Sequence, residues 1–419
     1  MIKIIKSIDE IKKRSNEIPQ EVEETTKNLI AEVRRDGDAA LFRHVEQFDK
    51  AKLGSLEVAN EEIEQSLSNM DKDFYKTINR AMDHIEGFHK NQIQQGFTHQ
   101  RDGVVLGQKV TPIERVGIYV PGGKAVYPST VLMNVIPAKL AGVKHITLVS
   151  PPKSDGTIDQ SILACAFLAG VDKLYKIGGA SAVAALTYGT ETVEKVYKIT
   201  GPGNIYVAAA KKQVYGDVGI DMIAGPSEIL IIADETANPK IVAGDLLSQA
   251  EHDSMASAIL LTTSDTLAQA VQKELENQIA TLSRGDICRR SIDDNSYIML
   301  CPTLEKAIEY ANDIAPEHLE LMLDQPFDYL GQVKNAGSIF LGKNTPEALG
   351  DYFAGVNHTL PTNSTAKFSS ALSVDTFVKK STFVYYSEAT LEKEKDDILL
   401  FAKKEGLEAH GQSVANRFE

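Results

Sequence analysis

The chain has 419 residues, of which 43% are hydrophobic and 24% are charged. This composition is typical of folded proteins rather than disordered segments, and the length suggests about two to four domains. The 58 acidic side chains outnumber the 44 basic ones, and the net charge is −14. An acidic balance argues against a duplex-binding protein, because neutralising phosphates requires a basic face.

The chain shows no sign of a membrane or export segment. No stretch approaches the ~18 consecutive apolar residues of a membrane span, and the N-terminal MIKIIKSIDEIKKRS lacks the apolar centre of a signal peptide. The cysteines Cys165, Cys288 and Cys301 are scattered and odd in number, as in reduced proteins. We therefore expect a soluble cytoplasmic protein with no nucleic-acid or membrane partner.

Residues 1–115 are predicted to be mainly helical. Apolar residues recur at helical spacing after Pro19, and a second helical stretch runs from about Asn60 to Gln95. Much of this region is expected to pack on the second of two α/β domains. Four histidines lie here among Lys, Glu and Gln and are interpreted as solvated surface residues: His44, His84, His89 and His99.

From Arg115 onward, short apolar strands alternate with helices rich in small residues. Four strand–turn–helix units predict a parallel α/β domain over residues 116–226. A second α/β domain is predicted over residues 227–370. After Gly225-Pro226, helical patterns alternate there with the strand-like segments EILIIAD, SAILLTT, YIMLCP and GSIFLG. The segment LEKAIEYANDIAPEHLELM is interpreted as helical. Residues 371–419 are predicted to be a C-terminal helical tail in which Gly406 ends a helix.

Phosphate-binding loops are common in α/β proteins, and the chain contains several Gly-rich segments. No G-x-G-x-x-G occurs, so the usual dinucleotide fingerprint is absent. The segment GSIFLGKN resembles a Walker loop but ends in Asn344, and its SIFL is typical of a buried strand. The turns Gly201-Pro202-Gly203-Asn204 and Pro121-Gly122-Gly123 lie where strands lead into helices, where anions bind. A ligand site and a plain tight turn are equally compatible with them.

Several side chains are candidates for chemistry, although none is decisive alone. Gln249 and His252 share a helical face and can reach one metal ion or hydrogen-bond each other. Glu317 and His318 are adjacent and, on a helix, would point about 100° apart toward two sides of a substrate; a plain helix start with Glu near its N-terminus is the simpler alternative. The remaining candidates are Asp351 and His358 in a loop of low charge, and His410 near the C-terminus, which is either a surface residue or one that crosses to a second subunit.

Seven sequence blocks together resemble the histidinol dehydrogenase family. They occur in order from about Arg115 to His410: VGIYVPGGKAVYPSTVLMNVIPAKLAGV, KITGPGNIYVAAAKK, DMIAGPSEILIIAD, DLLSQAEHD, APEHLELM, LGDYFAGVNHTLPT and EGLEAH. The resemblance implies two open, mainly parallel, Rossmann-like α/β domains in an aldehyde-dehydrogenase-like arrangement, with a small C-terminal dimerisation tail. It also implies NAD binding without the glycine fingerprint.

The resemblance implies a role for each matching residue. It implies that one zinc ion per subunit is held by Gln249, His252, Asp351 and, from the partner subunit, His410. It implies Glu317 and His318 as the catalytic pair. It implies contacts to substrate from these residues: Ser227, Gln249, His252, His318, Asp351, His358, Glu405 and His410. It implies NAD contacts from Tyr119, Asn204 and Ser181, where the family often has the longer Gln.

The implied activity is oxidation of L-histidinol through L-histidinal to L-histidine with two NAD, in histidine biosynthesis, by a homodimer that exchanges Glu405 and His410. Three alternatives remain at this point: another small polar alcohol as substrate, a zinc hydrolase, and a non-catalytic scaffold. A cysteine-based aldehyde route is a further rival. The cysteines are interpreted as buried core thiols, although Arg289 and Arg290 beside Cys288 favour a lower pKa for that thiol.

Overall fold

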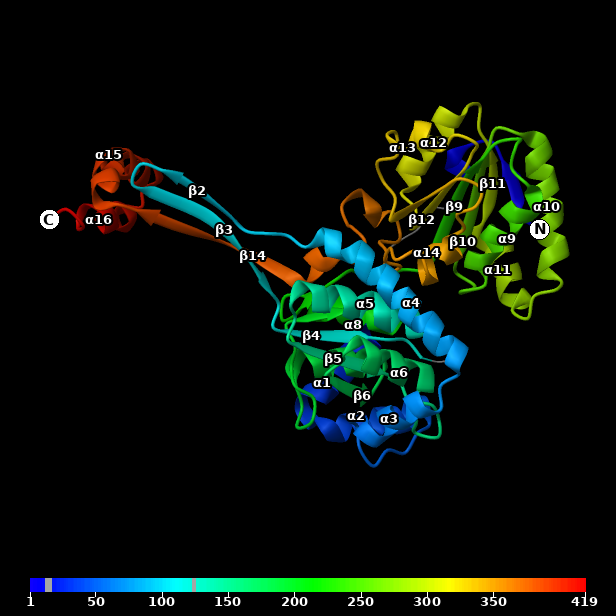
Figure 1. The fold of residues 1–419 in the computed structure, drawn as a ribbon, viewed down its shortest axis with the longest axis horizontal. Coiled ribbons are helices and arrows are strands. Elements are labelled where there is room, and N and C mark those ends of the chain that lie inside the picture. Colours follow the sequence, from blue (N-terminus) through cyan, green and yellow to red (C-terminus); the bar gives the residue numbers. More distant parts are fainter. Residues whose placement is uncertain (12–16, 123–125) are drawn as a thin grey trace. The chain divides into compact units, whose positions relative to one another are not determined.

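The computed structural model describes residues 1–11, 17–122 and 126–419. The chain divides into two units, each of which is described by itself (Figure 1). The first unit consists of Met1–Gln92 and Ile113–Phe377, and the second of Ile93–Pro112 and Val378–Glu419. Gly123, part of one of the Gly-rich turns, lies outside the described residues. Within those residues, no helix has both the length and the apolarity needed to cross a membrane.

The first unit contains a five-stranded parallel sheet in the order β6-β5-β4-β7-β8. Its strands are β4 (Arg115–Tyr119), β5 (His145–Ser150), β6 (Lys173–Lys176), β7 (Lys198–Thr200) and β8 (Gly219–Ile220). The helices that connect them are α5 (Pro128–Ala141), α6 (Gln160–Ala169), α7 (Gly179–Tyr188) and α8 (Ile205–Val214). Left-handed glycines end two of these helices, Gly142 after α5 and Gly170 after α6. The four predicted strand–helix units are confirmed.

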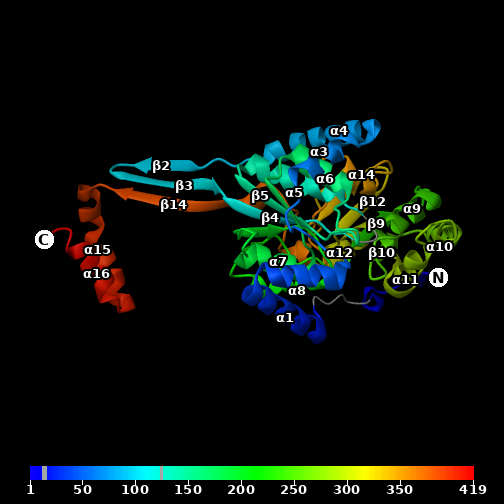
Figure 2. The same cartoon turned by 90° about the horizontal axis from the view of Figure 1, so that it is seen from below.

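Four N-terminal helices pack against this first sheet's helices. They are α1 (Gln20–Asp36), α2 (Asp38–His44), α3 (Asn60–Ser68) and α4 (Lys72–His89). Helix α1 lies beside α7 and α8, α3 contacts α6, and α4 contacts α5 (Figure 2). Ile30 and Val33 of α1 share a core with Val183 and Leu186 of α7. The expected packing of much of this region on the second α/β domain is wrong, because the Ala-rich α7 and α8 offer small side chains against which the apolar stripe of α1 fits closely.

Two histidines of this region are not on the surface. His44 is 4% exposed and His89 is 0% exposed, so their interpretation as solvated residues is wrong. Polar neighbours in the sequence suggested exposure, but each imidazole has a hydrogen-bond partner inside: Ser181 for His44 and Gln92 for His89. Buried polar groups are tolerated where they are paired in this way.

The second sheet of the first unit is six-stranded and parallel, in the order β1-β11-β10-β9-β12-β13. Its strands are β1 (Lys3–Ile5), β9 (Glu228–Ala233), β10 (Ser257–Thr262), β11 (Tyr297–Leu300), β12 (His318–Met322) and β13 (Ser338–Leu341). Its helices are α9 (Pro239–Ala250), α10 (Asp265–Ile279), α11 (Gly285–Asn295), α12 (Leu304–Ile314), α13 (Phe327–Leu330) and α14 (Glu347–Tyr352). The predicted second open sheet is confirmed, and SIFL is a strand of it.

One strand of this sheet was predicted to be helical. The chain leaves α12 at Ala315, whose φ of 52° is left-handed, and Pro316 follows. Residues His318–Met322 then form β12, and all five are buried between β9 and β13. Proline disfavours a helical conformation in the residue before it, and an unbroken buried run is typical of an inner parallel strand. Glu317 and His318 therefore stand at the start of a strand and not on a helix.

The second unit is an antiparallel sheet with two helices. Strand β3 (Val104–Pro112) pairs with both β2 (Phe97–Arg101) and β14 (Val378–Tyr386). Helices α15 (Glu388–Glu405) and α16 (Glu408–Ala415) follow, and Gly406, with φ of 70°, ends α15 as predicted. The predicted C-terminal tail over residues 371–419 has other boundaries than this unit. Residues 93–112 belong to the unit as well, and residues 371–377 do not.

Candidate active site

The candidate residues of the second sheet gather at the amino ends of its strands. Ser227 and Glu228 open β9, and Glu317 and His318 open β12, which is hydrogen-bonded to β9. Helix α9 returns the chain to this edge and ends near Gln249 and His252, while α14 carries Asp351. The five residues Gln249, His252, Glu317, His318 and Asp351 were selected from the sequence, and all of them belong to the first unit.

His318 is oriented by the main chain. Its Nδ1 lies 3.0 Å from the carbonyl oxygen of Glu228, to which it can donate. Its buried Nε2 has no hydrogen-bond partner among the described residues and lies 3.6 Å from Oδ1 of Asp351. A neutral imidazole that donates through Nδ1 keeps its basic lone pair on Nε2. When the ring is neutral, its bond to Glu228 therefore leaves the proton-accepting atom on the side that faces Asp351.

Burial and charge act in opposite directions on the catalytic candidates. Burial raises the pKa of Glu317 to about 8, although the neighbouring imidazole of His318 opposes that rise. Burial by itself lowers the pKa of His318, but the carboxylates of Glu317 and Asp351 outweigh it and hold that pKa at about 10. Glu317 also accepts a 2.9 Å hydrogen bond from the main-chain N–H of Glu228. The side chains of Glu317 and His318 therefore influence each other's pKa at a distance of 3.7 Å, in a site from which water is largely excluded.

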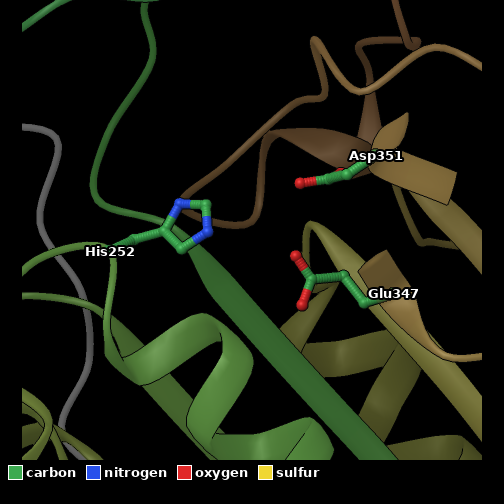
Figure 3. A group of neighbouring side chains, drawn as sticks. All are labelled: His252, Glu347 and Asp351. Atoms are coloured by element: carbon green, nitrogen blue, oxygen red, sulfur yellow. The ribbon is translucent and has the colours of Figure 1, made fainter. Parts of the chain in front are cut away.

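Three side chains of the kind that ligate metal ions lie beside this pair. Donor atoms of His252, Glu347 and Asp351 lie within 4.8 Å of one another, and Figure 3 shows the three side chains turned toward a common space. Burial raises the pKa of Asp351, but its close approach to the imidazole of His318 and the charges of the nearby histidines outweigh it, so the net shift is downward. A carboxylate kept ionised next to an imidazole suits a borderline divalent cation such as zinc.

Gln249 gives an independent indication of a ligand at this place. Its side chain is 0% exposed, and neither its Nε2 nor its Oε1 has a hydrogen-bond partner among the described residues. A buried amide without partners is costly. The preceding residue, Ser248, donates a 2.7 Å hydrogen bond to Glu347, which holds the end of α9 against α14. The residues present therefore fit a metal ion that takes the Gln249 oxygen as a ligand.

Glu347 was not among the residues predicted from the sequence. It lies four residues before Asp351, so both carboxylates face the same side of α14. This spacing was available in the sequence, but it is common on charged helices and does not by itself indicate a site. Burial raises the pKa of Glu347, and 2% exposure is unusual for a glutamate.

His358 bonds both to the segment that carries Asp351 and to a helix of the five-stranded sheet. Its Nδ1 lies 3.0 Å from the carbonyl oxygen of Asp351, and its Nε2 lies 3.2 Å from the hydroxyl of Thr130 on α5. Burial lowers the pKa of this imidazole, which favours a neutral ring. The expected substrate residues His358 and Ser227 thus lie on segments that also carry Asp351 and Glu228.

Glu405 and His410 belong to the second unit. Glu405 ends α15, His410 lies in α16, and both are exposed.

The expected NAD contacts line one cavity of 660 Å³ at the carboxyl ends of β4 and β5. Tyr119, Ser181 and Asn204 all border it. The Tyr119 hydroxyl accepts a 3.1 Å hydrogen bond from the N–H of Gly179, and burial raises its pKa to about 12. The side-chain oxygen of Asn204 caps α8, which leaves its amide N–H group for a ligand. The carboxyl edge of an open sheet is where such folds bind nucleotides.

The cysteines supply no nucleophile to the site around His318 or to the 660 Å³ cavity. All three are free and buried. Burial raises the pKa of Cys165 to about 12 and of Cys301 to about 11. Burial also raises the pKa of Cys288, so the lowering expected from its arginine neighbours is wrong. Thiols with raised pKa values are poor nucleophiles, which supports their interpretation as core residues.

Comparison with known proteins points in one direction. A sequence model described as histidinol dehydrogenase matches residues 12–418. The chain is 51% identical to a histidinol dehydrogenase of Clostridium acetobutylicum over 415 residues, covering 99% of this chain and 96% of the relative. It is 53% identical to that of Geobacillus kaustophilus over 393 residues, covering 94% and 93%. The crystal structure of histidinol dehydrogenase from Elizabethkingia anophelis superimposes with a TM-score of 0.94 at 39% identity, covering 100% and 98%.

Proposed function

The chain belongs to the histidinol dehydrogenase family, and on that premise we propose that it oxidises L-histidinol to L-histidine in two NAD-dependent steps at a zinc site. The observation that carries this proposal is the convergence of Asp351 and His252 with the buried base His318. A proton acceptor beside a group of metal donors supports the oxidation of a chelating alcohol. The reaction would belong to histidine biosynthesis.

Zinc would be held by Gln249, His252 and Asp351, with His410 of the partner subunit as the fourth ligand. Glu347 lies within reach of the same ion. When bound, zinc would supply a positive charge that binds the amine and imidazole of histidinol and so orients the alcohol near His318. Ser227 and His358 would contact the substrate from the same side of the site, and Glu405 of the partner subunit would complete its surroundings.

In the first step, Nε2 of His318 accepts the proton of the alcohol oxygen while the carbon gives a hydride to NAD and becomes an aldehyde. Asp351 raises the pKa of His318 in the protein alone. A cation at Asp351 offsets that negative charge and so lowers the pKa of His318 toward the range of a general base. The hydrogen bond from Nδ1 to the Glu228 carbonyl keeps Nε2 aimed at the alcohol.

In the second step, Glu317 accepts a proton from water as the water oxygen adds to the aldehyde carbon. Its pKa of about 8 matches a group that exchanges protons near neutral pH. Glu317 returns its proton to the former carbonyl oxygen, which completes the hydrate. His318, having passed its first proton to solvent, accepts the hydroxyl proton of the hydrate while a second hydride leaves to a second NAD. The products are the carboxylic acid, two reduced cofactors and two protons released through His318.

The 660 Å³ cavity would receive NAD. Tyr119, Ser181 and Asn204 border it, and the N-terminal ends of α7 and α8 present main-chain N–H groups there. The absent glycine fingerprint is compatible with this assignment, because Asn204 and the flanking turn supply polar contacts of their own.

The proposal is tested by the absorbance of NADH after histidinol is added to the purified protein, before and after treatment with a chelator. We expect two NADH per histidinol and loss of turnover on zinc removal, with recovery when zinc is returned. His318→Asn should lower kcat by about 10²–10⁴-fold with zinc content unchanged. Absence of NADH would contradict the proposal, as would full turnover by His318→Asn.

A further inference from the structure

A histidine outside the assigned catalytic residues forms part of the wall of the 660 Å³ cavity. His44 is the last residue of α2, is 4% exposed, and borders the cavity together with Ser181. Its Nδ1 lies 2.7 Å from Oγ of Ser181, and its Nε2 lies 3.0 Å from Oε2 of Glu32. Side chains of α1, α2 and α7 thus form one hydrogen-bonded chain that ends at the cavity.

With Glu32 ionised and the His44 ring neutral, the chemistry of the three groups determines where the protons lie. An ionised carboxylate can only accept, so Glu32 calls for a proton on Nε2 of His44. A neutral imidazole with its proton on Nε2 has a lone pair at Nδ1. Ser181 must then give its single hydroxyl proton to that lone pair. Its oxygen keeps lone pairs for a ligand but no proton.

No other group among the described residues bonds to the Ser181 hydroxyl. Ser181 is 5% exposed and stands in the first turn of α7, close to Gly179, whose N–H is bonded to the Tyr119 hydroxyl. The serine oxygen is therefore held in one orientation by His44 and keeps acceptor capacity at the cavity wall. A phosphate oxygen, which is also an acceptor, would be a poor partner for it.

We propose that Glu32 and His44 hold Ser181 as a hydrogen-bond acceptor for a neutral donor of the bound dinucleotide. This inference rests on the proposed NAD dependence. The donor is a ribose hydroxyl or an exocyclic N–H of NAD, since these are the neutral donors that the cofactor carries. His44 is a positioning residue, because it acts on the ligand through Ser181.

The first test measures the Kd for NAD of the full-length protein by titration calorimetry. Ser181→Ala should raise the Kd about three- to tenfold, which is the range for one hydrogen bond to a neutral group. Thr187→Val is the matched control, because it also removes a hydroxyl from α7. The Thr187 hydroxyl bonds to the carbonyl oxygen of Val183 at 2.7 Å and does not border the cavity. The Kd of Thr187→Val for NAD should equal that of the unchanged protein.

The second test asks whether His44 acts through Ser181. His44→Phe should also raise the Kd for NAD, and the double variant with Ser181→Ala should lose little more than Ser181→Ala alone. Additive effects of the two substitutions would contradict the positioning role. If His44→Phe fails to fold, His44→Gln is measured instead, because its amide can donate to Glu32 and accept from Ser181. An unchanged Kd then supports the positioning role, and a Kd raised as far as in Ser181→Ala contradicts it.

Three dinucleotide analogues, each of which lacks one hydrogen-bond donor of NAD, identify the group that bonds to Ser181. NADP replaces the adenosine 2′-hydroxyl by phosphate, deamino-NAD lacks the adenine amine, and 3-acetylpyridine adenine dinucleotide lacks the carboxamide N–H. The analogue that lacks the partner of Ser181 should bind the unchanged protein and Ser181→Ala equally. A penalty for Ser181→Ala that persists with all three assigns the donor to the remaining ribose hydroxyls.

The failures of the two proposals are distinguishable. If the unchanged protein binds no NAD, the proposed function is wrong. If it binds NAD and Ser181→Ala binds it with the same Kd, the role of Ser181 is refuted while the NAD dependence stands.

Discussion

Replacing Gln249 by Met should make the metal-free protein more stable and at the same time weaken its hold on zinc. The Gln249 amide is fully buried, and its oxygen and nitrogen have no partner among the described residues. An unsatisfied buried polar group costs about 1–3 kcal/mol. Methionine has a similar length and suits a helix, so the free energy of unfolding of the metal-free variant should rise by about 1–3 kcal/mol.

The assay is urea unfolding followed by circular dichroism, first on chelator-treated protein and then with zinc added. Zinc should stabilise the unchanged protein more than Gln249→Met, because the variant offers one ligand fewer. Gln269→Met is the control. Gln269 is exposed on α10 and bonds to Asp265 at 2.6 Å, so its replacement should change the free energy of unfolding by at most about 0.5 kcal/mol.

Two results would refute this reasoning. A metal-free Gln249→Met protein that unfolds at lower urea concentration than the unchanged one would show that the amide is satisfied in the protein itself. Equal stabilisation of both proteins by zinc would show that Gln249 is not a ligand.

The other predictions concern a buried ion pair, a pH dependence and the dimer. Lys211→Met should lose about 3–5 kcal/mol in urea unfolding, because Lys211 and Asp221 are 2% and 1% exposed and the carboxylate would be left buried; a loss under 1 kcal/mol would contradict this. Burial raises the pKa of Asp49 from 3.8 to about 6, so the native state binds its proton more tightly than the unfolded state and stability falls as pH rises from about 4 to 6. Asp49→Asn should therefore unfold at higher urea than the unchanged protein at pH 8 and equally at pH 3, and the same gain at both values would exclude this cause. Mixing inactive His410→Asn and His318→Asn proteins should restore part of the activity if sites are shared between subunits, and no recovery in verified heterodimers would count against sharing.

Local patterns in the sequence were sufficient for most elements of the two parallel sheets. Strands such as Glu228–Ala233 and Ser257–Thr262 are short apolar runs, and capping residues such as Asn204 and Asp159 mark helix starts. These signals depend only on neighbours within a few residues, since helix period, strand burial and capping are local properties. The candidate residues of the first unit were likewise recognised from short blocks, and the fold brings His252, His318 and Asp351 together.

The sequence by itself therefore determined the type of most elements and supplied the candidate side chains of the site. Only the tertiary structure decided that His318–Met322 is a central strand, that α1 packs on α7 and α8, and that Lys3–Ile5 adds an edge strand beside Tyr297–Leu300. It alone revealed Glu347 as a third candidate metal ligand beside His252 and Asp351, and His44 as a buried partner of Ser181. Each of these depends on which apolar surfaces and polar groups meet between segments far apart in the sequence, or on how the chain turns at Ala315-Pro316. Complementary packing in the whole molecule selects such pairings, and no local pattern does.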